Sequence, residues 1–154
     1  MRIMVVSDTH GQSAPLRKAL LSQPKAEIVI HLGDGEEDID EVREEFPKKM
    51  FLQVCGNCDW GSKLPISDEF TAEGIKIFYT HGHFYGVKTG YDNLISAAQK
   101  KGAKIALFGH THMAVERYKD GLYIMNPGSL HTKYGTYGII DITAQGIVLN
   151  TIKI

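Results

Sequence analysis

Short apolar runs alternate with segments of helical periodicity in the first third of the chain. The runs are rich in Val, Ile and Leu and predict buried strands, and the segments between them predict helices. Ser13 is expected to cap the first helix, with Pro15 in its first turn, and Pro47 is expected to stop the second. Strands that alternate with helices favour parallel pairing through crossover connections. The strands are expected at residues 2–7, 27–32 and 50–54, and the helices at 14–22 and 36–46.

The rest of the chain has a different pattern, dominated by pairs of apolar segments around short polar turns. Residues 70–79 predict a hairpin that turns at Glu73-Gly74, and two further hairpins are expected around 119–121 and 144–146. Their strands are expected at 115–118, 122–125, 137–142 and 147–152, with a helix at 91–101 and a strand at 104–108. Two packed sheets flanked by helices accommodate both halves and place the chain in the α/β class.

Length and composition fit an ordinary globular protein. The chain has 154 residues, of which 43% are hydrophobic and 23% charged, which argues against disorder and a coiled coil. No linker, repeat or low-complexity segment interrupts it, so one domain spanning residues 1–154 is expected. The chain has 17 basic and 18 acidic residues, a balance that makes a nucleic acid an unlikely partner.

No apolar run approaches the ~20 residues that a membrane span requires, so an integral membrane protein is not expected. The apolar stretch before Asp8 is too short for a signal peptide, and a cytoplasmic location is the expectation.

Five polar clusters follow predicted strands directly. In open α/β sheets, ligands bind beyond the carboxyl ends of the strands, so clusters at these ends are expected to converge on one site. Their Asp, His and Asn side chains suit manganese, iron, zinc or nickel rather than calcium. The clusters are residues 8–11, 33–35, 56–59, 81–83 and 109–112.

Seven side chains in these clusters are candidate metal ligands: Asp8, His10, Asp34, Asn57, His81, His110 and His112. Seven ligands are too many for one ion, whereas two ions that share a bridging carboxylate can use them all. Two such ions carry net positive charge beside two carboxylates and would attract a phosphate ester. Asp8 and His10, and likewise His110 and His112, are two residues apart. On an extended segment the members of each pair would point the same way and could face one metal centre or two adjacent ones.

This ordered set of motifs resembles the calcineurin-like metallophosphoesterase superfamily, and the segment Asn126-Pro127-Gly128-Ser129 is similar to its small bacterial and archaeal phosphodiesterase branch. The resemblance implies a four-layer α/β/β/α sandwich, with two mixed sheets flanked by helices and a binuclear site at one edge. It implies two divalent ions, with manganese favoured and nickel, iron or zinc open. The implied ligands are Asp8, His10, Asp34 and His112 for the first metal, with Asp34 bridging, and Asn57, His81 and His110 for the second.

The activity implied is hydrolysis of a small organic phosphodiester by in-line attack of a metal-bridging hydroxide. Asn57 is expected to help orient the phosphoryl oxygens, and His83 is a further candidate for contact with the substrate. One position departs from many relatives, because Cys58 stands where they carry a histidine thought to protonate the leaving group. A neutral thiol is a weaker general acid than an imidazolium, which leaves the role of Cys58 open.

Two other functions compete with this one. The vacuolar-sorting 29 subunit of retromer resembles the same branch, which makes a non-catalytic, metal-binding protein-interaction scaffold the alternative. Completeness of the ligand set favours the enzyme. The motif Cys55-x-x-Cys58 is superficially that of a redox protein, but that hypothesis leaves the Asp and His motifs unexplained. The sequence leaves open whether copies of the chain associate into a homo-oligomer.

Overall fold

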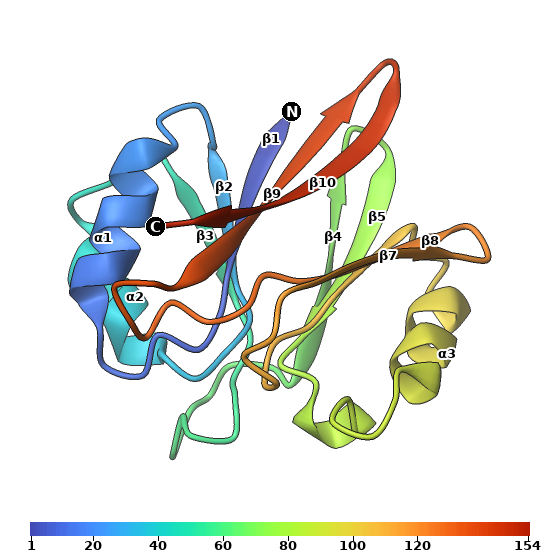
Figure 1. Cartoon of the computed structure of the whole chain (residues 1–154), viewed down its shortest axis with the longest axis horizontal. Helices are drawn as coiled ribbons and strands as arrows, with labels where there is room; N and C mark the ends of the chain where they lie inside the picture. The colour runs from blue at the N-terminus through green and yellow to red at the C-terminus, as the bar shows by residue number, and fades with distance from the viewer.

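Two five-stranded sheets pack face to face, with two helices on the outer face of one sheet and a third helix on the outer face of the other (Figure 1). This is the expected four-layer arrangement of helices, sheet, sheet and helix, seen in a computed structural model that describes residues 1–154. None of the helices is long and apolar enough to cross a membrane.

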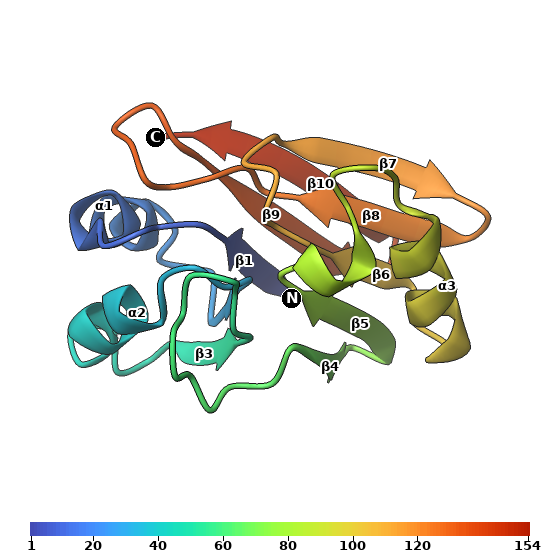
Figure 2. The same cartoon turned by 90° about the horizontal axis from the view of Figure 1, so that it is seen from below.

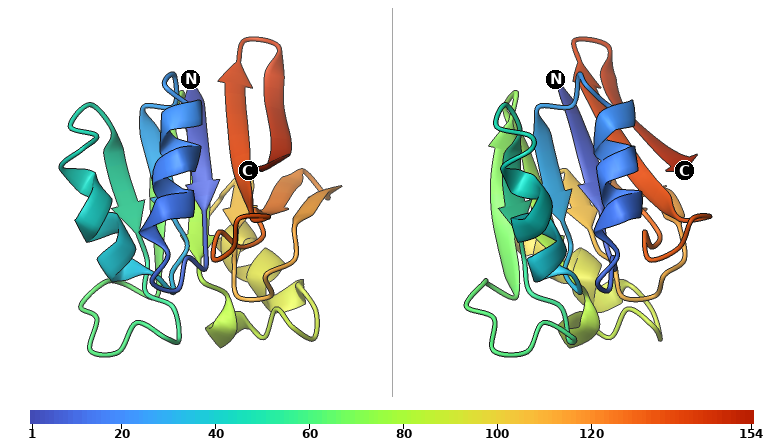
Figure 3. Two further views of the ribbon diagram at one scale, coloured as in Figure 1. Left: turned by 60° about the vertical axis from the view of Figure 1, so that its left-hand side comes forward. Right: turned by 90° about the vertical axis from the view of Figure 1, so that its left-hand side faces the viewer.

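The first sheet has the strand order β10-β9-β1-β2-β3. Its strands β1, β2 and β3 are parallel, with Ile3 opposite Ile28 and Ile30 opposite Leu52, whereas β9 and β10 are antiparallel. Helices α1 and α2 are the crossovers that join the parallel strands, and they lie on one face of the sheet (Figure 3). The bounds are β1 Arg2–Val6, α1 Ser13–Ser22, β2 Ile28–His31, α2 Glu36–Arg43, β3 Met50–Gln53, β9 Thr136–Thr143 and β10 Gly146–Lys153.

The second sheet has the order β4-β5-β6-β8-β7. Its central strands β5, β6 and β8 are parallel to one another, and β4 and β7 pair antiparallel at the two edges. Helix α3 covers its outer face (Figure 2). The bounds are β4 Ser67–Ala72, β5 Ile75–Thr80, a short 3-10 helix η1 His83–Tyr85, α3 Asp92–Lys100, β6 Ile105–Leu107, β7 Val115–Lys119 and β8 Leu122–Asn126.

Three separate apolar clusters fill the three gaps between the four layers. Alternation along β1 shows how one strand serves two of them, because successive side chains point to opposite faces of a sheet. Ile3 and Val5 are fully buried between the two sheets, and Met4 and Val6 are fully buried against α1 and α2. The third cluster, which includes Leu94 of α3, lies outside the second sheet.

Most elements expected from the sequence are confirmed, and the capping role of Ser13 is wrong. Gln12 occupies the position before α1, and Ser13 is the first helical residue. The Ser13 hydroxyl donates to Glu41 of α2 at 2.8 Å instead of capping its own helix. The second helix ends at Arg43 rather than residue 46. Between Arg43 and Pro47 the backbone N–H groups of Glu45 and Phe46 donate to carbonyls three residues back, as in isolated turns, rather than four residues back as in an α-helix. The 3-10 helix η1 was not expected from the pattern.

Candidate metal centre

The loops that follow β1, β2, β3, β5 and β6 bring all seven predicted ligands together at one end of the sheets (lower end in Figure 3). The seven side chains form two neighbouring groups, which we call the first and second half-sites. The first half-site contains Asp8, His10 and His112. The Nε2 atom of His112 lies 3.1 Å from Asp8 Oδ1 and 3.2 Å from His10 Nε2, and His10 Nε2 lies 3.7 Å from Asp8 Oδ1.

The second half-site is centred on His81. Its Nε2 atom lies 3.1 Å from Asn57 Oδ1, 3.2 Å from His110 Nδ1 and 3.3 Å from Asp34 Oδ2. The same Asp34 oxygen is 3.9 Å from His10 Nε2 of the first half-site. Asp34 therefore lies between the two half-sites, where the bridging ligand was expected.

The tautomer of His81 indicates that the second half-site is built for a cation. Its Nδ1 lies 2.8 Å from the carbonyl oxygen of Leu32, which can only accept, so Nδ1 carries the proton. In the neutral ring the lone pair of Nε2 then faces oxygens of Asp34 and Asn57, which are acceptors too, so a proton or a metal ion at Nε2 is favourable. Burial acts to lower the pKa of His81, but the hydrogen bond and charge of Asp34, with the charge of Asp8, outweigh it and raise the pKa. The surroundings therefore favour positive charge at this position.

Asp8 supplies the corresponding observation in the first half-site. Its side chain is fully buried, and its Oδ2 atom accepts hydrogen bonds from the Ser7 hydroxyl and the His110 N–H. Its Oδ1 atom is buried without any donor. A buried carboxylate oxygen with no donor is costly unless a cation neutralises it. A donor set of carboxylates, imidazoles and an amide oxygen fits divalent metal ions.

Backbone conformation sets the candidate ligands apart from the rest of the chain. Five of the seven have positive φ, at 54° for Asp8, 47° for His10, 58° for Asp34, 66° for His110 and 58° for His112. The other non-glycine residues with positive φ are Glu73 and Asp120, which lie in hairpin turns. Such conformations cost of order 1–3 kcal/mol each and cluster at functional sites.

This geometry corrects the expectation that the ligand pairs lie on extended segments. Asp8 and His10 do face one half-site, but through two left-handed residues rather than through strand alternation. His110 and His112 are not on an extended segment either, and they face different half-sites, as the family resemblance implied, since His110 contacts His81 and His112 contacts Asp8.

Sequence reasoning missed the role of Asp59, which is the last residue of the third motif. Its carboxylate accepts four backbone N–H groups: those of Asp34 and Gly56 on Oδ2, and those of Gly35 and Glu36 on Oδ1. It therefore joins the loops after β2 and β3 and caps the start of α2, which has no cap of its own. An acidic residue three positions after glycine in a strand-end loop was the available signal.

Glycine at position 33 lets these two loops approach each other. Its φ is 99°, and a Cβ there would lie 2.5 Å from the backbone nitrogen of Gly56. Any side chain would push the two ligand loops apart.

The remaining site residues expected from the sequence also lie beside the centre. The exposed Cys58 thiol lies with His10 and Asp34 in a group whose ligand atoms are within 4.8 Å of one another. Burial and the neighbouring Asp34 raise the pKa of this thiol. The His83 ring centroid is 5.3 Å from that of His81, and its buried Nδ1 has no hydrogen-bond partner. The ring of His131, in the loop before β9, lies 5.7 Å from that of His112.

A hollow of about 630 Å³ borders the centre along His10, Asp34 and Cys58. Its outer rim carries carboxylates on α2 and the indole of Trp60, which is 92% exposed. Three more large apolar side chains are exposed outside this hollow: Phe84 directly after His83, Met113 directly after His112, and Tyr134 between β8 and β9. Trp60 on the rim can contact an organic group beside an anion held at the centre.

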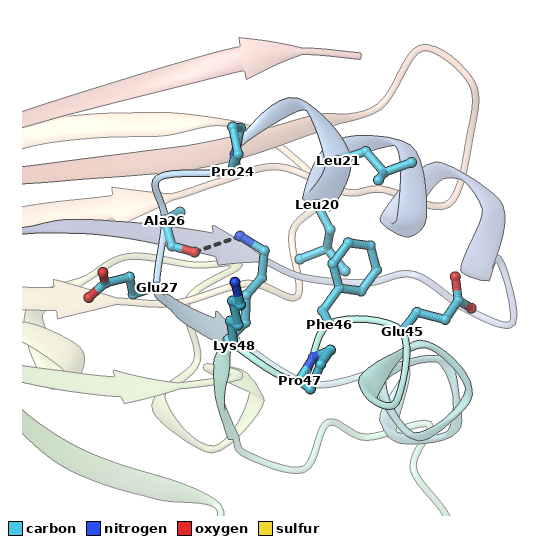
Figure 4. A pocket seen from close by; sticks show the side chains of 10 residues that line it. Leu20, Leu21, Pro24, Ala26, Glu27, Glu45, Phe46, Pro47 and Lys48 are labelled. Atoms are coloured by element: carbon cyan, nitrogen blue, oxygen red, sulfur yellow. Dashed lines mark hydrogen bonds between the residues drawn. The ribbon is translucent and has the colours of Figure 1, made fainter.

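A second hollow, of about 400 Å³, lies at the opposite end of the parallel strands (Figure 4). Its lining comes from the end of α1 and from segments that precede β2 and β3, and includes Leu20, Leu21 and Phe46. Lys49 closes it by donating to the carbonyl of Ala26 at 2.6 Å. It carries none of the candidate ligands.

Residues 1–145 match the model of the calcineurin-like phosphoesterase superfamily domain. The chain belongs to this superfamily, as its fold and ligand arrangement indicate. Bacillus subtilis YsnB, a probable metallophosphoesterase, is 32% identical over 131 residues, which are 84% of this chain and 75% of that protein. Vacuolar protein sorting-associated protein 29 of Schizosaccharomyces pombe is 38% identical over 135 residues, 84% of this chain and 72% of that one.

Among solved structures, an archaeal phosphodiesterase superposes with a TM-score of 0.77 at 25% identity, covering all of both chains. The superfamily to which the sequence motifs pointed and the expected α/β fold with two mixed sheets are therefore confirmed. The neighbour that is named a phosphodiesterase supports the expectation that the chain is a hydrolase.

Proposed function

We propose that this protein is a phosphodiesterase that depends on two divalent metal ions and hydrolyses a small organic phosphodiester. One observation carries the proposal: two half-sites share the carboxylate of Asp34, and the first of them contains a buried carboxylate oxygen, Asp8 Oδ1, that lacks a donor. The phosphodiesterase among its structural neighbours supports the same reaction class. Manganese is the proposed metal, with nickel, iron and zinc as alternatives.

The residues divide between the two ions as the geometry suggests. One ion would be held by Asp8, His10 and His112, and the other ion by Asn57, His81 and His110. Asp34 would bind both ions. When bound, two such ions lower the pKa of a water molecule to near neutrality and offset the charge of a phosphate.

The chain's own groups then orient the substrate and limit which leaving groups depart. Asn57 is exposed, and its amide donates to the Cys58 sulfur at 3.3 Å, which fixes its oxygen toward His81. With a raised pKa, the Cys58 thiol holds its proton more tightly than an imidazolium at neutral pH. The proposal therefore favours diesters with good leaving groups, with His83 beside the second half-site as a contact for the substrate.

The test is hydrolysis of bis(p-nitrophenyl) phosphate by metal-stripped protein with and without added Mn²⁺. We expect turnover only with metal, and we expect Asp34→Asn to abolish turnover and lower metal occupancy, because the shared ligand loses its charge. Asp40→Asn is the matched control, since Asp40 is exposed on the rim of the same hollow and lies away from the ligands. Wild-type turnover with two ions bound in Asp34→Asn would show that the site is assigned wrongly. Activity that survives a chelator would instead support thiol chemistry at Cys58.

The exposed apolar rim and the likeness to a vacuolar sorting protein favour one second candidate, a metal-binding scaffold for a protein partner. A folded protein that binds two ions but turns over no diester with any divalent metal would support the scaffold over the enzyme.

A further inference from the structure

A chain of buried hydrogen bonds lies behind the candidate ligands and uses none of them. It joins Thr9, His31 and Asp38, which are 0%, 1% and 4% exposed. Thr9 belongs to the loop after β1, His31 ends β2, and Asp38 lies in the first turn of α2. Asp38 thus connects the covering helix to two of the ligand loops.

The direction of every bond in this network is fixed. The Gly33 N–H donates to His31 Nδ1 at 3.1 Å, so Nδ1 accepts and the ring proton is on Nε2. His31 Nε2 then donates to the Thr9 hydroxyl at 3.2 Å, and that hydroxyl donates to Asp38 Oδ2. Asp38 Oδ2 also accepts the Gly11 N–H at 3.0 Å. Burial lowers the pKa of His31 to about 4, so the ring is neutral at neutral pH.

The bonded residues flank the ligands in the sequence. Thr9 lies between Asp8 and His10, Gly11 follows His10, and Gly33 precedes Asp34. A Cβ at Gly35 would lie 1.8 Å from the Thr9 hydroxyl oxygen, so the network fills the space directly beneath the loop of Asp34. Asp8, His10 and Asp34 all have unfavourable positive φ, and the network holds a residue next to each of them: Thr9 beside Asp8, Thr9 and Gly11 beside His10, and Gly33 beside Asp34.

We propose that Thr9, His31 and Asp38 are positioning residues, which hold the loops of Asp8, His10 and Asp34 in the conformation that binds metal. The proposal rests on the metal centre proposed above. Direct hydrogen-bond partners of a metal's ligands typically affect its affinity by 10–100-fold, and this network acts on the ligands one step further out, through their backbone. The Thr9 hydroxyl is the central member, since it is both acceptor and donor.

Two matched pairs of variants test the network by calorimetric titration of metal-stripped protein with Mn²⁺. Thr9→Val keeps the shape of the side chain and removes the hydroxyl, whereas Thr9→Ser keeps the hydroxyl. Asp38→Ala removes the acceptor, whereas Asp38→Asn keeps one oxygen that can accept from both Thr9 and Gly11. We expect Mn²⁺ binding to be about tenfold weaker in Thr9→Val and Asp38→Ala, at the lower end of that range, and close to wild type in Thr9→Ser and Asp38→Asn.

A readout without metal accompanies each titration. Nitrogen NMR of the His31 ring should show a proton on Nε2 and not on Nδ1 in the wild type and in Thr9→Ser, and a changed Nε2 environment in Thr9→Val. Thermal melting of the metal-stripped variants checks that they fold. If Thr9→Val does not fold, the comparison of Asp38→Ala with Asp38→Asn still tests the proposal.

The outcomes separate the two proposals. Unaltered Mn²⁺ affinity in folded Thr9→Val and Asp38→Ala, even with lower melting temperatures, would show a merely structural role and overturn the network alone. A proton on His31 Nδ1 in the wild type would overturn it as well. A wild-type protein that binds no Mn²⁺ at all, with the His31 signal as expected, would overturn the metal centre and the positioning role together.

Discussion

Replacing Asp59 with asparagine should destabilise the protein more than its partly exposed position suggests. Its two carboxylate oxygens accept four backbone N–H groups, two on each oxygen, at 2.7 to 3.2 Å. Asparagine offers one oxygen and one NH₂ group. Whichever way the amide turns, two backbone donors face another donor, and the two bonds that remain lose their charge assistance.

The magnitude follows from the two bonds lost. A hydrogen bond to a charged group contributes about 1.5–3 kcal/mol, so two of them amount to roughly 3–6 kcal/mol. Because Asp59 is partly exposed, water can serve some of the freed donors, and we expect a loss near the lower end, about 3 kcal/mol. For a chain of this length that corresponds to a fall in melting temperature of roughly 6–12 °C.

Urea unfolding of metal-stripped protein at pH 7 measures this loss, with Asp40→Asn as the control. Asp40 is exposed and has only a 3.6 Å ion pair with Arg43, so the control should change stability by less than about 0.5 kcal/mol. A loss below about 1 kcal/mol in Asp59→Asn would refute the reasoning, since the two lost bonds would then contribute far less than charge-assisted hydrogen bonds do.

The pH dependence of the difference in unfolding free energy between wild type and Asp59→Asn is a second check. Burial acts to raise the pKa of Asp59, but the N–H bonds, led by that of Gly56, outweigh it and hold the pKa below its usual value. A carboxyl whose pKa is depressed in the folded state stabilises the protein above its unfolded pKa, near 4, and this contribution is lost as the pH falls through the folded value. The difference in unfolding free energy between wild type and Asp59→Asn should therefore become smaller below about pH 4.

Two further predictions concern His31 and Cys58. The pKa of His31 falls from 6.5 to about 4 on folding, so the unfolded state binds more protons in that interval and stability decreases as the pH drops from 6.5 to 4, by about 3 kcal/mol in total. Urea unfolding of metal-stripped wild type and His31→Gln across this range should show the shallower slope in the variant, and parallel curves would contradict the burial of a neutral ring. Cys58→His supplies a general acid beside the centre, so kcat/KM for p-nitrophenyl phosphate with Mn²⁺ should rise, on the order of 10²-fold if the imidazole acts as such an acid. Unchanged monoester kinetics in a folded variant would remove that idea.

The candidate ligands were predictable because each motif is local and stands at a strand end. The apolar run of β1 and the polar Asp8 that follows it are adjacent in the sequence, and the same is true at β2 and β5. What was not predictable is how the ligands reach the centre. The left-handed backbone of Asp8, His10 and Asp34 is held by contacts to residues elsewhere in the chain, and a spacing of two residues suggested an extended segment instead.

The sequence by itself determined the elements, their two-faced strands and the order of the ligand motifs, because hydrophobic periodicity and turn chemistry act over a few residues. Only the tertiary structure decided which strands distant in the sequence pair and what supports the ligands. Strand β9 lies beside β1 although some 130 residues separate them. Asp59, in the loop after β3, accepts a hydrogen bond from the backbone N–H of Asp34 in the loop after β2. Those choices depend on hydrogen bonds and burial between distant segments. Such interactions leave no period in the sequence, and they become favourable only once the two sheets have packed together.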